Sequence, residues 1–124
     1  MGYLLDTHSL LWALGKPDAL SEQARTAIGD ANNVIHVSIA SLWECAIKAS
    51  IGKLELPEEF FDAVTGAGFE ELQIRIPHLK VYGGLPMHHR DPFDRMLVAQ
   101  AAAESLTLIS RDSKIAEYDV DILD

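Results

Sequence analysis

Three short apolar runs, separated by segments with helical spacing, constrain the fold of this chain most strongly. They lie at Gly2–Asp6, Val34–Val37 and Thr107–Ser110. Continuous apolar runs of this length are typical of strands buried on both faces of a parallel sheet. Strands that alternate with helices form right-handed β–α–β units. The sequence therefore predicts an α/β fold, a three-layer α/β/α sandwich with a central parallel β-sheet.

Helix-start residues and apolar periodicity predict where the other elements lie. Thr7 and Ser9 are candidate caps for a first helix through Leu10–Leu14. The other expected helices are Ser21 to about Asp30, Ser38 to about Ile51, Glu58 to about Ala67, a short helix opened by Pro77, one capped by Asp91, and Ser113–Glu117. Further strands are expected at Leu72–Ile76, at or near a sheet edge, and at Asp119–Leu123.

The length and composition favour a single soluble domain over residues 1–124. The only cysteine, Cys45, excludes an intrachain disulfide and a cysteine-only metal cage. We expect a cytoplasmic protein with no membrane association, because no secretory leader pattern and no run of eighteen apolar residues occurs.

The net charge of −9 argues against nucleic-acid binding by the whole surface. The ten basic residues are nevertheless unevenly spread, and five of them lie within four positions of a candidate site residue: Lys48, Arg90, Arg95, Arg111 and Lys114. A basic rim around an acidic centre is compatible with a phosphodiester substrate and a divalent cation. Local charge balancing on a solvated surface is the alternative.

The stretch His88–Ala103 opens with polar residues and continues as an apolar helix. Asp91 followed by Pro92 is typical of an N-cap with proline at the first helical position. Asp94 then falls in the first turn, where the helix dipole favours a negative charge. One interpretation is that Asp91 and Asp94 form a reciprocal capping box. The other is that Asp94 is a metal ligand.

Four acids are predicted to converge at the carboxyl edge of the sheet, where ligands bind in such folds. Asp6 ends the first strand, Asp112 follows the third apolar strand, and Glu44 and Asp94 lie on helices that reach the same edge. Two carboxylates about 4 Å apart repel by about 4 kcal/mol at an effective dielectric near 20. A hard cation relieves such repulsion, and carboxylate ligands suit Mg²⁺ or Mn²⁺.

Each acid also has a structural alternative. Asp6 is a candidate cap for the helix that follows it, and Asp112 for the helix beginning at Ser113. Glu44 is placed to pair with Lys48 at i, i+4, which contributes only about 0.3–0.5 kcal/mol.

Four blocks of the sequence resemble the PIN-domain family, specifically VapC-type toxins of bacterial toxin–antitoxin pairs. They are Leu5-Asp6-Thr7-His8, Ser41-Leu42-Trp43-Glu44, His89-Arg90-Asp91-Pro92-Phe93-Asp94-Arg95 and Ser110-Arg111-Asp112. The blocks span essentially the whole chain in the family's order. The resemblance implies a Mg²⁺- or Mn²⁺-dependent endoribonuclease that cleaves RNA, forms a homodimer and is inhibited by a VapB-type antitoxin.

The resemblance also implies roles for individual residues. Asp6, Glu44, Asp94 and Asp112 match the family's catalytic, metal-binding acids, with Asp112 at its most variable position. On this reading Asp6 and Asp94 are the principal metal ligands, directly or through water, and Glu44 and Asp112 complete the shell or orient the attacking water. Thr7 and Ser110 are expected to hydrogen-bond to these acids. The candidates for contacting the RNA backbone are Arg90, Arg95, Arg111 and Lys114. His8, His88 and His89 lack zinc-site spacing and are expected to be solvated or hydrogen-bonded.

Other functions fit the sequence less well. A phosphatase with an aspartyl nucleophile needs a second Asp two residues after Asp6, where His8 stands. A response-regulator receiver needs paired acids there, and a dinucleotide site needs a glycine-rich turn. The alternative from another class is a catalytically inactive PIN-like module that dimerises and binds a partner protein.

Overall fold

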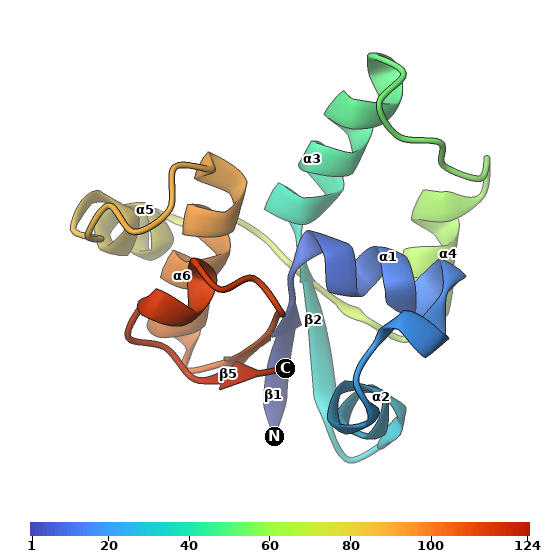
Figure 1. The fold of residues 1–124 in the computed structure, drawn as a ribbon, viewed down its shortest axis with the longest axis horizontal. Helices are drawn as coiled ribbons and strands as arrows, with labels where there is room; N and C mark the ends of the chain where they lie inside the picture. The colour runs from blue at the N-terminus through green and yellow to red at the C-terminus, as the bar shows by residue number, and fades with distance from the viewer.

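The computed structural model describes residues 1–124, which form a five-stranded sheet with helices on both faces (Figure 1). The strands are β1 (Gly2–Leu5), β2 (Val34–Ser38), β3 (Glu70–Leu72), β4 (Thr107–Ile109) and β5 (Ile122–Leu123). The α-helices are α1 (Thr7–Gly15), α2 (Glu22–Gly29), α3 (Ile39–Ser50), α4 (Phe60–Gly66), α5 (Ile76–Gly83) and α6 (Pro92–Glu104). Two short 3₁₀ helices complete the chain, η1 (Pro17–Ala19) and η2 (Ile115–Glu117).

All neighbouring strands are parallel, in the order β3-β2-β1-β4-β5. The register places Leu5 beside Val37 on β2 and Ile109 on β4. The N–H of Asp6 then donates to the Ile109 carbonyl at 3.1 Å, so the chain leaves β1 and β4 at neighbouring points. The carboxyl ends of the central strands therefore meet at one edge, as the sequence predicts.

Successive residues of the strands point to opposite faces of the sheet and pack in two separate hydrophobic cores. Leu4 and Leu108 pack on one face with the apolar side of α6. Leu5 and Ile109 pack on the other face with residues of α1, α2 and α4. Figure 1 shows α5 and α6 on one side and α1, α2 and α4 on the other. The predicted three-layer α/β/α sandwich is confirmed.

The predicted strand at Leu72–Ile76 is displaced in the structure. Strand β3 runs over Glu70–Leu72 because its pairing with β2 ends at Ser38, where the chain turns into α3. Beyond that point Ile74 packs on the core without a strand partner, and Ile76 already belongs to α5. The last strand is likewise shorter than predicted, Ile122–Leu123, because it pairs only with the short β4.

None of the helices has both the length and the apolar run that a membrane crossing requires.

Candidate metal centre

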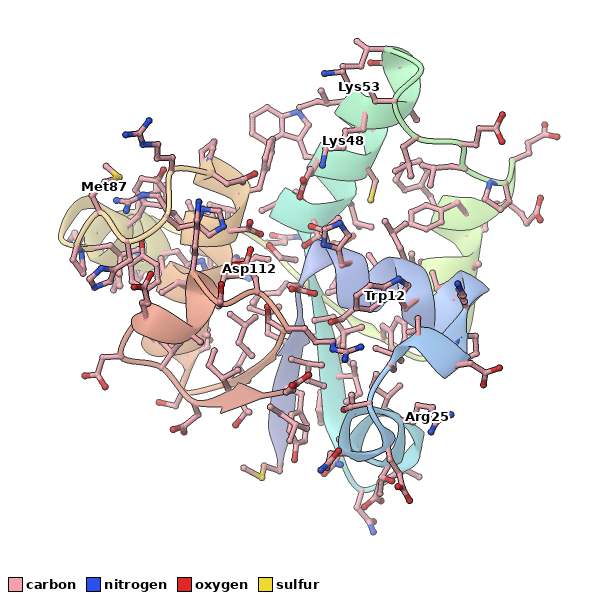
Figure 2. The ribbon with its side chains drawn as sticks, viewed as in Figure 1. Trp12, Arg25, Lys48, Lys53, Met87 and Asp112 are labelled. Atoms are coloured by element: carbon pink, nitrogen blue, oxygen red, sulfur yellow. The ribbon has the colours of Figure 1, made fainter.

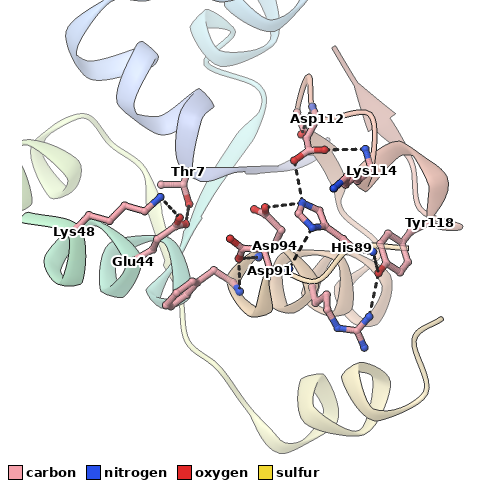
Figure 3. Close-up of polar contacts among 12 residues, drawn as sticks. Thr7, Glu44, Lys48, His89, Asp91, Asp94, Asp112, Lys114 and Tyr118 are labelled. Atoms are coloured by element: carbon pink, nitrogen blue, oxygen red, sulfur yellow. Dashed lines mark hydrogen bonds and ion pairs between the residues drawn. The ribbon is translucent and has the colours of Figure 1, made fainter. Parts of the chain in front are cut away.

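The four acids predicted from the sequence lie at or near the carboxyl edge of the sheet, each on a different segment. Asp6 follows β1, Glu44 lies in α3, Asp94 lies in the first turn of α6, and Asp112 follows β4. Figure 2 labels Lys48 on α3 and Asp112 in the loop that follows β4. Figure 3 shows the Glu44, Asp94 and Asp112 side chains in close-up.

Asp94 and Asp112 are brought together through a histidine. The Nε2 atom of His89 lies 3.0 Å from Oδ2 of Asp94 and 3.1 Å from Oδ2 of Asp112 (Figure 3). One ligand atom from each of these three residues lies within 4.8 Å of the others. This is the most compact set of potential metal ligands in the structure. Asp6 and Glu44 lie outside it.

The charge environment of Asp94 is strongly unfavourable for an anion. The pKa of its carboxyl is raised to about 7, chiefly by burial and then by the negative charge of Asp91. Glu44 and Asp6 contribute smaller increases to this value, and contact with His89 acts in the opposite direction. Asp6 and Glu44 are therefore close enough to act on Asp94 electrostatically, although they are outside the compact set.

The pKa of Asp112, unlike that of Asp94, is lowered. Burial would raise the pKa of its carboxyl, but the N–H of Lys114 and the His89 side chain hydrogen-bond to it and lower the pKa overall. The Lys114 N–H donates to Oδ1 at 2.8 Å. Ser110 supports the turn, because its hydroxyl accepts the Asp112 N–H at 3.1 Å. Asp112 thus caps the turn leading to η2 and still presents Oδ2 to the site.

Glu44 is held in one orientation by two neighbours. The Thr7 hydroxyl donates to its Oε1 and the Lys48 ammonium to its Oε2, both at 2.7 Å (Figure 3). The hydrogen bond to Glu44 raises the pKa of Lys48, so the ammonium remains charged. The pairing expected at i, i+4 is thus present. The Glu44 side chain is only 8% exposed, whereas the Lys48 side chain is 44% exposed, so the pair joins a buried carboxylate to an ammonium at the surface.

Asp6 both caps a helix and lies at the site. Its Oδ1 accepts the N–H of Ser9 at 2.8 Å, which makes Asp6 the N-cap of α1. The prediction that Thr7 or Ser9 caps this helix is therefore wrong, since both residues lie inside it. Asp6 is 4% exposed.

Asp91 caps α6, but the reciprocal capping box is absent. Oδ1 of Asp91 accepts the N–H groups of Phe93 and Asp94. The N–H of Asp91 donates to Nδ1 of His89 at 3.2 Å, not to Asp94. The Asp94 carboxylate is thereby left to face His89 and the other acids.

These residues fit a hard divalent cation. The oxygens of Asp94 and Asp112 are donors that Mg²⁺ and Mn²⁺ prefer. Burial first, and then the negative charge of Asp91, raise the pKa of Asp94, and a bound cation would favour the charged form of this carboxyl. The geometry favours Asp94 and Asp112 as the acids that would hold the ion, in place of the expected Asp6 and Asp94, because Asp6 lies outside the compact set. Asp6 and Glu44 would complete the acidic surroundings.

The sequence of residues 3–121 matches the family model described as PIN domain. This chain belongs to the PIN-domain family. No curated protein matches the sequence.

Solved structures share the fold of this PIN domain over nearly its whole length. VapBC2 from Rickettsia felis, bound to a DNA fragment from its promoter, matches with a TM-score of 0.76 and 19% identity, covering 99% of this chain and 98% of that chain. DNA-bound VapBC from Salmonella typhimurium matches with a TM-score of 0.74 and 20% identity, covering 100% and 98%. VapBC-5 from Mycobacterium tuberculosis, a member of a toxin–antitoxin family, matches with a TM-score of 0.62 and 15% identity, covering 98% and 97%.

The basic side chains of this PIN domain differ in their surroundings. Arg90 and Lys114 are exposed beside the site. Arg111 binds the Ala19 carbonyl and the Asp124 carboxylate.

Arg95 is buried within the PIN domain. Its guanidinium donates to the Pro86 carbonyl and the Tyr118 hydroxyl and lies 4.9 Å from the centre of the Tyr82 ring. These contacts favour a structural role for Arg95 over the RNA contact expected from the sequence.

His89 is the site residue that sequence reasoning missed. Its spacing matches no zinc motif, so the sequence predicts only a solvated or hydrogen-bonded histidine. The structure confirms the hydrogen bonding but directs it to two acids of the site. No pattern in the sequence indicates this, since Asp112 reaches His89 only through the fold.

Proposed function

We propose that this PIN domain is a Mg²⁺- or Mn²⁺-dependent endoribonuclease, the toxin of a VapBC-type toxin–antitoxin pair. The proposal rests on the close approach of the Asp94 and Asp112 carboxylates. The negative charges of Asp6 and Glu44 also act on the Asp94 carboxylate. The fold shared with VapBC proteins supports it. The expected partners are RNA, a VapB-type antitoxin and a second copy of the chain, in the cytoplasm.

Each residue of the site has a distinct part in the proposed reaction. Asp94 and Asp112 would bind the cation, and when bound it would activate water and offset charge on the phosphate. Thr7 and Lys48 hold Glu44 beside these acids, and Ser110 holds the Asp112 turn. Arg90 and Lys114, which are exposed at the rim, would contact RNA phosphates.

A catalytically inactive interaction module is the second candidate. Large apolar side chains are exposed on α3 and α5, with Trp43 58% and Leu79 52% exposed. Exposed apolar surface of this kind often marks contacts with other proteins. Such a module would need no metal, so metal binding separates the two candidates.

Manganese is expected to stabilise the parent protein against heat but not the Asp6→Asn variant. When the free Mn²⁺ concentration is a hundred times its Kd, binding adds about 2.7 kcal/mol to the free energy of unfolding. Asparagine is also a good N-cap, so the variant should fold. Thermal denaturation with and without Mn²⁺ measures the effect.

Asp62→Asn, which changes an exposed acid in α4, is the matched control and should respond like the parent. No Mn²⁺ response in the parent would favour the inactive module, whereas an equal gain in the parent and Asp6→Asn would show that Asp6 is not needed to bind the ion.

A further inference from the structure

His89 lies in the loop before α6 with its imidazole between two carboxylates of the site. The distances from Nε2 to the two Oδ2 atoms, 3.0 Å to Asp94 and 3.1 Å to Asp112, are almost equal. The His89 side chain is 13% exposed, so water competes little for these contacts. The ring therefore contacts both carboxylates at once.

The other ring nitrogen fixes which atom carries the proton. Nδ1 of His89 accepts the N–H of Asp91 at 3.2 Å, and an acceptor nitrogen carries no hydrogen. The ring hydrogen must then be on Nε2, directed at the carboxylates. The backbone is also fixed, because the His89 N–H donates to the buried Tyr118 hydroxyl at 2.9 Å.

A nitrogen that carries a hydrogen has no lone pair to offer a metal. Ligating histidines normally donate their second ring N–H to an acceptor, whereas Nδ1 here faces a donor. Direct ligation by Nε2 would require the ring proton to move to Nδ1 and the bond from Asp91 to break. The arrangement suits a hydrogen-bond donor to carboxylates.

We propose that His89 is a positioning residue that competes with the divalent cation for Asp94 and Asp112. Its Nε2–H is shared between the Oδ2 atoms of Asp94 and Asp112, the two carboxylates that would also hold the cation. This inference rests on the proposed metal-dependent function. His89 keeps the two carboxylates close before an ion binds, and ion binding releases the imidazole from them.

Replacing the donor should separate this role from that of a ligand. His89→Ala is expected to lower the melting temperature of the metal-free protein, because the two carboxylates lose their shared donor. It should also tighten Mn²⁺ binding roughly tenfold, because the ion no longer displaces a charge-assisted hydrogen bond. Isothermal titration with MnCl₂ and metal-free thermal denaturation measure the two effects.

Two further variants serve as controls. His89→Gln keeps an N–H donor and should restore much of the parental affinity and melting temperature. His88→Ala removes the neighbouring exposed histidine, whose ring packs on Tyr118, and should leave Mn²⁺ affinity unchanged.

The possible outcomes are distinct. If the parent binds no Mn²⁺, the proposed metal-dependent function is wrong, and this inference is wrong with it. If the parent binds Mn²⁺ but His89→Ala binds it equally well or more weakly, only the inference is overturned. A loss of affinity in His89→Ala would instead make His89 a ligand.

Discussion

Asp94→Asn is expected to lower RNA cleavage at least about a thousandfold, because a metal site contributes several kcal/mol of transition-state stabilisation. The Asp94 carboxylate contacts His89. It is also repelled by three other acids, Asp91, Glu44 and Asp6. Asparagine keeps the shape of the side chain and removes the charge on which a cation depends. A single-turnover assay on single-stranded RNA with Mg²⁺ measures the loss.

The fold should survive this substitution. The N–H of Asp94 remains bonded to Oδ1 of Asp91, so the α6 cap is kept. Circular dichroism and the melting temperature should therefore show a folded variant. The exposed Asp62→Asn variant should cleave like the parent. Parental cleavage by Asp94→Asn would show that this carboxylate is not needed for the reaction.

Leu97→Ala is expected to lower the free energy of unfolding by about 2–5 kcal/mol. Leu97 is fully buried in the middle of α6, where it packs with Leu4 and Leu108 of the sheet. Truncation leaves a cavity between the helix that carries Asp94 and the strands that precede Asp6 and Asp112. Urea denaturation measures the change.

Leu79→Ala is the matched control, because it makes the same chemical change at a residue that is 52% exposed. It should cost less than about 0.5 kcal/mol. Similar losses in the two variants would contradict the assignment of the core to this face of the sheet.

The sequence predicts the central strands and the principal helices because burial leaves direct patterns. Leu4, Leu5 and Val37 belong to continuous apolar runs, and the structure places them in two cores on opposite faces of one sheet. The Asp91-Pro92 start of α6 is confirmed because capping is a local interaction. Elements near the sheet edges are less predictable, since the extent of β3 depends on where β2 ends.

The candidate site is only partly readable from the sequence. The strand-end position of Asp6 indicates its place at the sheet edge, and the i, i+4 spacing indicates the Glu44–Lys48 pair. The link between His89 and Asp112 joins residues 23 positions apart, and no local pattern encodes it. The burial of Arg95 likewise depends on Tyr118, which lies on a distant segment.

Analysis of the ends of cleaved RNA tests most directly whether acids that hold a divalent cation drive hydrolysis by water. We expect purified protein to cut single-stranded RNA with Mg²⁺ or Mn²⁺, to leave no 2′,3′-cyclic phosphate, and to lose activity with EDTA or with Asp6→Asn. Cutting that persists in EDTA and leaves a 2′,3′-cyclic phosphate would show attack by the RNA 2′-hydroxyl and contradict the metal-dependent mechanism.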